Sequence, residues 1–195
     1  MLPWRKRVEI GSDAGLFAER RATASQRAAF TLLDGLLAAV GFVLRLGGRP
    51  LQWILCQTIG TILYAAFPGR RRVARINLDL AFGGTRSARE KRRITRAMFV
   101  HFVRLGMDFL WDDVYWPLDA LPSRVSYEGH DVLVEALKEG RGCLGATGHL
   151  GNWELLGAAT VALGIPMAVV FRAPHGAYAD HLIARKRRRF GFHLV

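Results

Sequence analysis

Cysteine is scarce in this chain of 195 residues, in which only Cys56 and Cys143 occur. One lies in an apolar run and the other in a run typical of a buried strand, so neither a disulfide framework nor a cysteine-based zinc site is indicated. We therefore expect a reducing, cytosol-facing compartment. We also expect no bound metal ion and no cofactor.

Acidic residues are also few, with 16 Asp and Glu against 28 Lys and Arg and a formal charge of +12. Apolar residues make up 51% of the chain, which excludes intrinsic disorder because a disordered chain lacks the apolar surface that offsets ordering entropy. Soluble nucleic-acid binders are usually basic and hydrophilic. A membrane-surface protein that handles an anionic substrate fits both properties better.

A cleavable signal peptide is not recognisable at the N-terminus. The first apolar stretch begins only near Ala28, behind a polar segment that includes Glu19, Arg20, Arg21 and Arg27. We therefore expect the apolar segment to stay attached to the protein.

Two apolar runs follow, at residues 28–44 and 51–67, separated by a break at 45–50 that contains Pro50. The first has a single charge, Asp34, and is near the lower length limit for a membrane span. The second has several polar side chains, which favours an interfacial helix or one buried against protein over a second span. Alternatively, both are core helices of a soluble bundle. Basic residues on both sides leave the membrane orientation undecided.

Residues 69–93 are rich in arginine, and this pattern favours contact with anionic head groups over a merely solvated helical face. Ser87 and Glu90 have the spacing of a capping box, and apolar residues continue at helical spacing to Phe109, which predicts a long helix. The aromatic and acidic segment 111–119 is either an interfacial aromatic belt or an exposed loop.

Alternating elements are predicted from Tyr127 onward. The predicted order is helix 130–139, strand 143–147, helix 152–163, strand 167–171, helix 177–189 and a further strand at 192–195. In the first of these helices, the residues expected to face inward are Val132, Leu133, Ala136 and Leu137. Strands and helices in alternation indicate an α/β fold with a parallel sheet.

Residues 148–154, Gly-His-Leu-Gly-Asn-Trp-Glu, are the most informative stretch. On a regular helix, His149 and Glu154 would be separated by about 140° and could not share a face. If His149 lies in the loop that leaves a strand, Gly151 permits the bend and Asn152 caps the next helix, with Glu154 in its first turn. The two side chains can then meet at the carboxyl end of the sheet, where open α/β folds place their sites.

This arrangement indicates general-base chemistry. A carboxylate on one imidazole nitrogen leaves the other basic, so that His149 can take a proton from a substrate hydroxyl. Since no serine or cysteine adjoins His149 as a nucleophile, direct transfer of an acyl group to an alcohol is favoured. The alternatives are a structural histidine in a tight turn and a metal site of His149, Glu154, His175 and His181, which lacks helical i, i+4 ligand spacing.

Three ordered blocks resemble the lipid A biosynthesis late acyltransferases, the lauroyl and myristoyl acyltransferase family within the lysophospholipid acyltransferase group. GHLGNWELLG resembles the family's first motif, and ARINLDLAF is similar to the element after its membrane segment. FRAPHGAYADHLI is similar to the second block: Arg172, Tyr178 and Asp180 match, whereas Gly176-Ala177 replaces the usual Asn-Pro. The resemblance runs from about Ala28 to the last residue.

The resemblance implies transfer of a fatty acyl group from acyl carrier protein to a hydroxyl of an anionic lipid A precursor, at the cytoplasmic face of the inner membrane. By motif, His149 is the base and Glu154 its partner. Arg172 and one of Arg187 or Arg189 are expected to bind phosphate or to stabilise the oxyanion, and Asn152 is a further expected substrate-binding residue. For the arginines at the end of the last helix, a solvated helix end is the alternative. The expected partners are acyl carrier protein, the lipid precursor and the membrane, but not nucleic acid.

The resemblance also implies a domain organisation: a basic polar segment at 1–27, membrane-anchoring or interfacial helices at 28–67, and the N-terminal portion of the acyltransferase domain at 68–195. This last portion is expected to be an incomplete parallel βαβα domain, because family members continue well beyond this point. The resemblance thus implies either a fragment or C-terminally truncated product or a degenerate family member, and we expect this chain by itself to have little activity. Other possible acceptors are a glycerophospholipid or a phosphatidylinositol mannoside, and a non-catalytic basic membrane-surface or nucleic-acid-binding protein is the alternative from another class.

Overall fold

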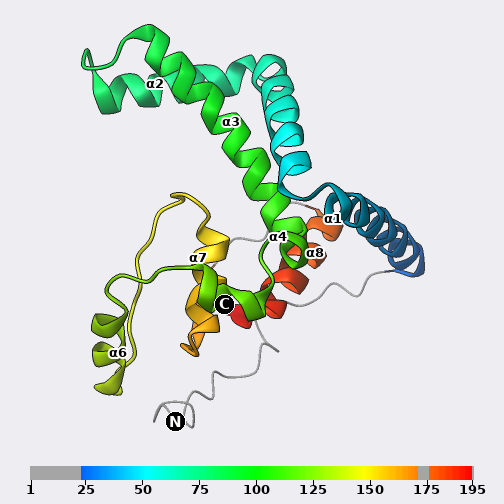
Figure 1. Ribbon diagram of the computed structural model, residues 1–195, viewed down its shortest axis with the longest axis vertical. Helices are drawn as coiled ribbons and strands as arrows, with labels where there is room; N and C mark the ends of the chain where they lie inside the picture. Colours follow the sequence, from blue (N-terminus) through cyan, green and yellow to red (C-terminus); the bar gives the residue numbers. More distant parts are fainter. Residues whose placement is uncertain (1–22, 171–175, 195) are drawn as a thin grey trace. The chain divides into compact units, whose positions relative to one another are not determined.

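The computed structural model describes residues 23–170 and 176–194 and divides into two units (Figure 1). One unit comprises the described residues up to Gly35 together with those from Trp116 onward, and the other comprises Leu36–Tyr115. Predicted site residues Arg172 and His175 lie outside the described residues.

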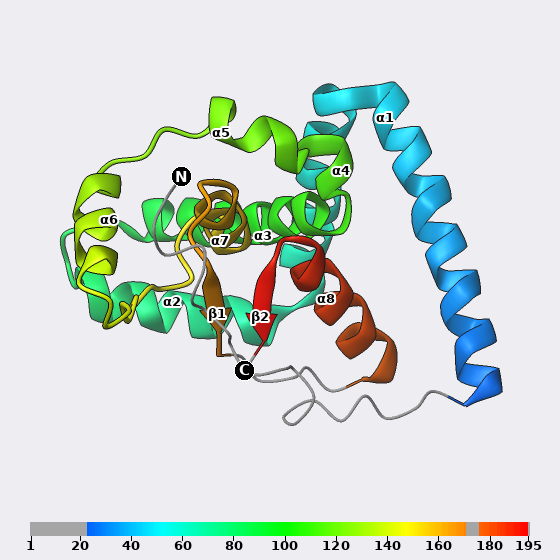
Figure 2. The same ribbon diagram turned by 90° about the horizontal axis from the view of Figure 1, so that it is seen from below.

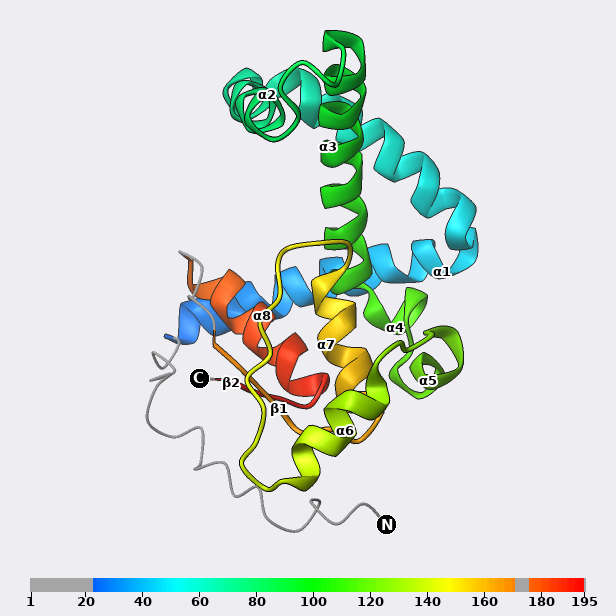
Figure 3. The same ribbon diagram turned by 90° about the vertical axis from the view of Figure 1, so that its left-hand side faces the viewer.

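The two apolar runs form one helix, α1 (Ala24–Ala66), with a kink (Figure 3). At the kink Gly48 has φ 54° and ψ −151°, a left-handed conformation that glycine adopts without steric cost. Pro50 follows two residues later and lacks a backbone N–H, which removes one helical hydrogen bond. The predicted break at 45–50 is therefore a kink within a helix that begins at Ala24.

The unit Leu36–Tyr115 also contains α2 (Pro68–Phe82), α3 (Ala88–Leu110) and the short α4 (Asp112–Tyr115). The capping box predicted for the long helix is confirmed: the Glu90 N–H donates to Ser87 Oγ at 3.2 Å, and the Ser87 N–H donates to the Glu90 carboxylate at 2.8 Å. The predicted helix up to Phe109 is therefore confirmed as α3.

A buried polar cluster joins α1 to α3, and the sequence analysis did not predict it. Gln52 Nε2 donates to Asp108 Oδ1 at 2.6 Å, and Arg49 donates to Gln52 Oε1 at 2.8 Å and to the Tyr115 carbonyl at 3.0 Å. Gln52 and Asp108 are 2% and 6% exposed. Buried polar groups are costly unless they are hydrogen-bonded, so these bonds stabilise the packing of α1 on α3.

The segment 111–119 is not an exposed loop at its centre. Asp112 and Tyr115 of α4 are buried, and the Trp111 indole N–H donates to the Leu37 carbonyl at 2.8 Å. The exposed-loop expectation was wrong here because Trp111 and Tyr115 pack against α1 within their own unit, and the aromatic belt stays a prediction.

The other unit contains a parallel two-stranded sheet, β1 (Met167–Val169) and β2 (Phe192–Leu194), with Ala168 opposite His193 (Figure 2). Helix α8 (Ala177–Arg189) lies between these strands in the chain, and α7 (Trp153–Ala162) packs on both strands. The remaining elements of this unit are η2 (Leu118–Ala120), α5 (Leu121–Arg124) and α6 (His130–Lys138). The predicted strand–helix–strand order from 167 to 194 is confirmed.

One sequence prediction for this unit was wrong, and another held for three of its four residues. Residues 143–147 form no strand: they are exposed, and Leu144 is 98% exposed. An apolar run becomes a strand only where a neighbouring strand pairs with it, and β1 pairs with β2 in the described sheet. In α6 no residue is fully buried: Leu133, Ala136 and Leu137 are half-buried as expected, whereas Val132 is 69% exposed and not inward-facing. The described structure is thus mostly helical with a small parallel sheet, compatible with α/β but without the first strand of the predicted βαβα order.

Small residues let α7 lie close to β2. A Cβ placed on Gly157 would lie 2.5 Å from Phe192 Cζ. We expect Gly157→Ala to destabilise the protein, because overpacking costs about 1–3 kcal/mol whereas the gain in helix propensity is about 1 kcal/mol.

The matched control is Gly106→Ala in α3, where an added Cβ meets no atom within 4 Å. Only the propensity gain applies there, so this variant is expected to raise the midpoint of thermal unfolding followed by circular dichroism. A higher midpoint for Gly157→Ala would contradict the close packing of α7 on Phe192.

Candidate active site

The loop that enters α7 has the geometry predicted from the motif. Gly151 has φ 57°, and Asn152 Oδ1 accepts the backbone N–H of Leu155 at 2.9 Å. Asn152 is thereby the N-cap, and Glu154 lies in the first turn of α7. The positive end of the helix dipole favours a carboxylate at this place.

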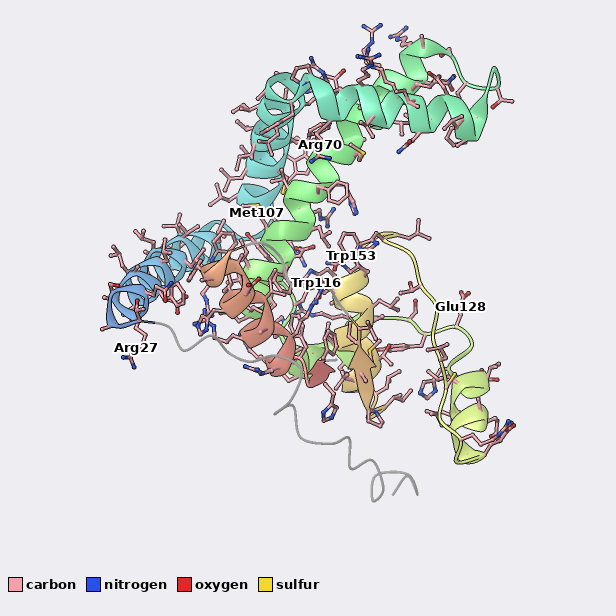
Figure 4. All side chains as sticks on the ribbon, turned by 180° about the vertical axis from the view of Figure 1, so that it is seen from behind. Arg27, Arg70, Met107, Trp116, Glu128 and Trp153 are labelled. Carbon is pink, nitrogen blue, oxygen red and sulfur yellow. The ribbon has the colours of Figure 1, made fainter. Side chains whose placement is uncertain are left out.

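His149 is exposed immediately before this turn. Its imidazole contacts the ring of Trp153 edge to face, with the ring centroids 4.6 Å apart and the planes at 71°. Trp153 is labelled in Figure 4 at the N-terminal end of α7. This contact limits the orientations of the imidazole and leaves it accessible to substrate. The sequence analysis did not assign a role to Trp153, although it lies within the motif.

The Glu154 carboxylate binds Arg187 of α8. Arg187 donates from its Nε to Oε2 at 3.2 Å and from a terminal nitrogen to Oε1 at 2.6 Å. The side chains of Arg187 and Glu154 are only 14% and 13% exposed. A two-point contact of this kind fixes the plane of the guanidinium, so two residues that the sequence analysis selected separately form one unit.

His149 and Glu154 are neighbours in the motif, but no hydrogen bond joins their side chains in the described part of the chain. An ionised carboxylate has about four acceptor positions, so the two bonds from Arg187 do not use all of them. The His149–Glu154 pair therefore stays a prediction, whereas the Glu154–Arg187 pair is observed.

Of the remaining predicted substrate-binding residues, Asn152 caps α7, Arg189 lies at the C-terminal end of α8, and Arg172 lies outside the described residues. Arg189 is the last residue of α8 and is exposed. It follows a basic turn in which positive charges favourably face the negative end of the helix dipole. Its role in binding substrate, like those of Asn152 and Arg172, stays a prediction.

Asp180 lies two turns before Arg187 on the same side of α8, since seven residues are close to two helical turns. Its Oδ1 atom is buried, and within residues 23–170 and 176–194 it has no hydrogen-bond partner. In the sequence, Asp180 matches the second block of the resembled family, but no role was predicted for it. The side of α8 that bears Arg187 thus also bears a buried carboxylate oxygen.

A second cluster lies on α8, where it contacts the first part of α1. Asp34 accepts hydrogen bonds from the Tyr178 hydroxyl at 2.8 Å and from the Arg185 guanidinium at 2.8 Å. Phe30 contacts Tyr178 and stacks on His181. The single charge of the first apolar run is therefore paired with protein groups.

Burial, and then the hydrogen bond to Asp34, raise the pKa of Tyr178 above its usual value of about 10. Because the folded state favours the neutral phenol, this stabilisation is present below the unfolded pKa and is lost as the pH rises through the folded pKa. Burial also raises the pKa of Tyr115, so we expect spectrophotometric titration to show one late-ionising phenol fewer in Tyr178→Phe, and in Asp34→Asn one that ionises earlier. A titration curve unchanged by Asp34→Asn would contradict the contact.

Metal binding has no structural basis in the described residues, where no group of three or more His, Cys, Asp or Glu side chains is placed to hold an ion. His175, one member of the metal alternative, lies outside them. The described site instead offers an accessible imidazole and a guanidinium held by a carboxylate. Such a set suits proton removal and the binding of anionic or developing negative charge.

A comparison with protein families agrees with this chemistry. The model of the family described as bacterial lipid A biosynthesis acyltransferase matches residues 19–195. No curated protein and no solved structure matches the chain significantly.

Proposed function

The chain belongs to the bacterial lipid A biosynthesis acyltransferase family, and from this premise we propose that it transfers a fatty acyl group from acyl carrier protein to a hydroxyl of a lipid A precursor. Family membership implies acyltransferase activity on lipid A. Three further points are proposed: acyl carrier protein is the acyl donor, individual residues have the catalytic roles given below, and the reaction takes place at the cytoplasmic face of the inner membrane.

The proposed reaction needs no covalent enzyme intermediate. His149 takes the proton of the acceptor hydroxyl as its oxygen attacks the thioester carbonyl. This attack forms the new carbon–oxygen bond. The tetrahedral intermediate then collapses: the carbonyl re-forms, the carbon–sulfur bond breaks, and the leaving thiolate takes the proton from the imidazolium. The products are an ester and a free carrier thiol.

The arginines bind negative charge in this proposal. Arg187, oriented by Glu154, contacts a phosphate of the lipid precursor or the oxyanion of the intermediate. Arg172 and Arg189 are proposed to contribute in the same way, and Asn152 to bind substrate near the cap of α7. Glu154 is proposed to have a second role as the hydrogen-bond partner of His149.

The observation that supports this proposal most directly is the contact between Glu154 and Arg187. These residues are 33 positions apart: Glu154 belongs to the first motif, and Arg187 lies four residues beyond the end of the second block. The contact places a guanidinium beside the turn that begins α7, next to the motif that contains His149. A structural ion pair alone would not require an accessible histidine in the preceding loop.

Membrane association is the proposed setting. Helix α1 is long and apolar enough to cross a membrane, and only 11% of its most apolar window is buried. A core helix of a soluble bundle would instead be mostly buried. We expect the protein to resist extraction by high salt, which screens charge attraction, and to require detergent.

Lipid analysis of a deletion strain tests the acceptor. We expect its lipid A to lack one acyl chain, and we expect wild-type protein, but not His149→Ala, to restore that chain. A change confined to glycerophospholipids would assign the enzyme to another acceptor, and unchanged lipids would contradict the proposal.

A further inference from the structure

Helix α2 packs on its unit through one face only. Its less exposed positions Arg71, Ala74 and Leu78 recur at helical spacing. Arg71 donates to the Tyr64 carbonyl at 2.7 Å and lies over the Tyr64 ring at 5.0 Å. At the other end of α2, Lys91 of α3 donates to Asp79 at 2.5 Å. These contacts fix the rotation of α2 about its own axis.

The face exposed by this rotation contains an apolar stripe. Val73, Ile76 and Leu80 are 51%, 47% and 82% exposed. At about 100° per residue these three side chains lie within about 60° of the helix circumference. Three neighbouring aliphatic side chains on a charged helix are unfavourable in water, so this stripe needs an apolar environment.

Exposed arginines border the stripe on both sides. Arg70 lies about 60° beyond Val73, and Arg72 lies about 40° beyond Ile76 on the opposite side. The acidic residue of α2, Asp79, is paired with Lys91. The exposed side of α2 is therefore apolar along its centre and positively charged along both edges.

A bilayer surface with anionic head groups provides both environments at once. The aliphatic side chains can enter the acyl region, while arginines extend to the phosphates with their apolar stems along the boundary. Nucleic acid would satisfy the arginines but leave the stripe in water. A protein groove would cover the stripe but would have to supply anions along both edges.

We propose that α2 is an in-plane membrane helix, with Val73, Ile76 and Leu80 inserted among the acyl chains of an anionic bilayer and Arg70 and Arg72 bound to its phosphates. This contact is separate from α1. It does not depend on the proposed reaction, so it is tested equally well on the catalytically impaired His149→Ala variant.

The test uses the full chain in the His149→Ala background with Cys56 and Cys143 replaced by alanine. An environment-sensitive fluorophore is attached through Leu80→Cys in the stripe or, as a matched control, through Arg75→Cys, which lies about 140° away on the same helix. The vesicles contain equal parts of phosphatidylglycerol and phosphatidylcholine, with or without bromine on the acyl chains.

Because α1 brings both probes to the same vesicle, only the rotation of α2 distinguishes them. We expect brominated chains to quench the Leu80 probe about threefold more than the Arg75 probe. Replacing Arg70 and Arg72 with glutamine is expected to reduce this difference. Equal quenching of the two probes, or no quenching, would overturn the proposal. A blue-shifted Leu80 probe that bromine does not quench would show that protein covers the stripe, which also overturns it.

Discussion

Replacing His149 with alanine is expected to lower acyl-transfer turnover by about 10² to 10⁴, the usual effect of losing general-base assistance. The structure places this imidazole against Trp153 at the start of α7, with its ring accessible. Its accessible position also means that the substitution removes little packing, so the fold is expected to survive. Steady-state rates with purified enzyme and an unchanged thermal midpoint check both statements.

The matched control is His101→Ala, which removes another exposed imidazole, from α3. It is expected to retain wild-type turnover. Full activity of purified His149→Ala would refute the proposed base.

Breaking the Glu154–Arg187 pair is expected to have the second largest effect. Either Glu154→Ala or Arg187→Ala should reduce turnover by about 10², because a displaced guanidinium or carboxylate loses its alignment with the reacting groups. The double variant should be little worse than either single variant, since residues that act as one unit show non-additive effects. Arg187→Lys should not restore activity, because an ammonium group lacks the planar fork that contacts both carboxylate oxygens.

A structural effect must be separated from a catalytic one for this pair. Removing one partner of a largely buried ion pair costs about 3–5 kcal/mol of stability, so each rate is compared with the thermal midpoint of the same variant. Arg188→Ala, exposed on the same helical turn, is the control and should leave turnover near wild type. Loss of activity in Glu154→Ala with normal turnover in Arg187→Ala would show that the pair is not the working unit.

The sequence predicted those helix limits that are determined by residues at the helix ends themselves, such as capping side chains and flanking glycines. Ser87 with Glu90 sets the start of α3, and Asn152 sets the start of α7, because each side chain bonds its own helix N-terminus. The predicted limits of the helix at 177–189 agree with α8, whose preceding and following glycines are conformationally free. The parallel pairing of β1 and β2 followed from the helix between them.

Tertiary contacts explain what the sequence could not predict. The bonds of Gln52 and Arg49 with Asp108 and Tyr115 join residues more than 50 positions apart, and nothing in the local pattern signals them. The predicted strand at 143–147 failed because a short apolar run does not specify a pairing partner. In the same way, the motif pointed from His149 to Glu154, whereas the folded chain brings Arg187 from α8 to the carboxylate.

The most direct measurement of the central claim is mass spectrometry of a lipid A precursor incubated with the enzyme and an acyl carrier protein thioester. The proposed function predicts that the lipid gains one acyl chain, that one carrier thiol is released for each chain transferred, and that both signals are lost in His149→Ala. Release of thiol without acylated lipid, or equal acylation by His149→Ala, would contradict it.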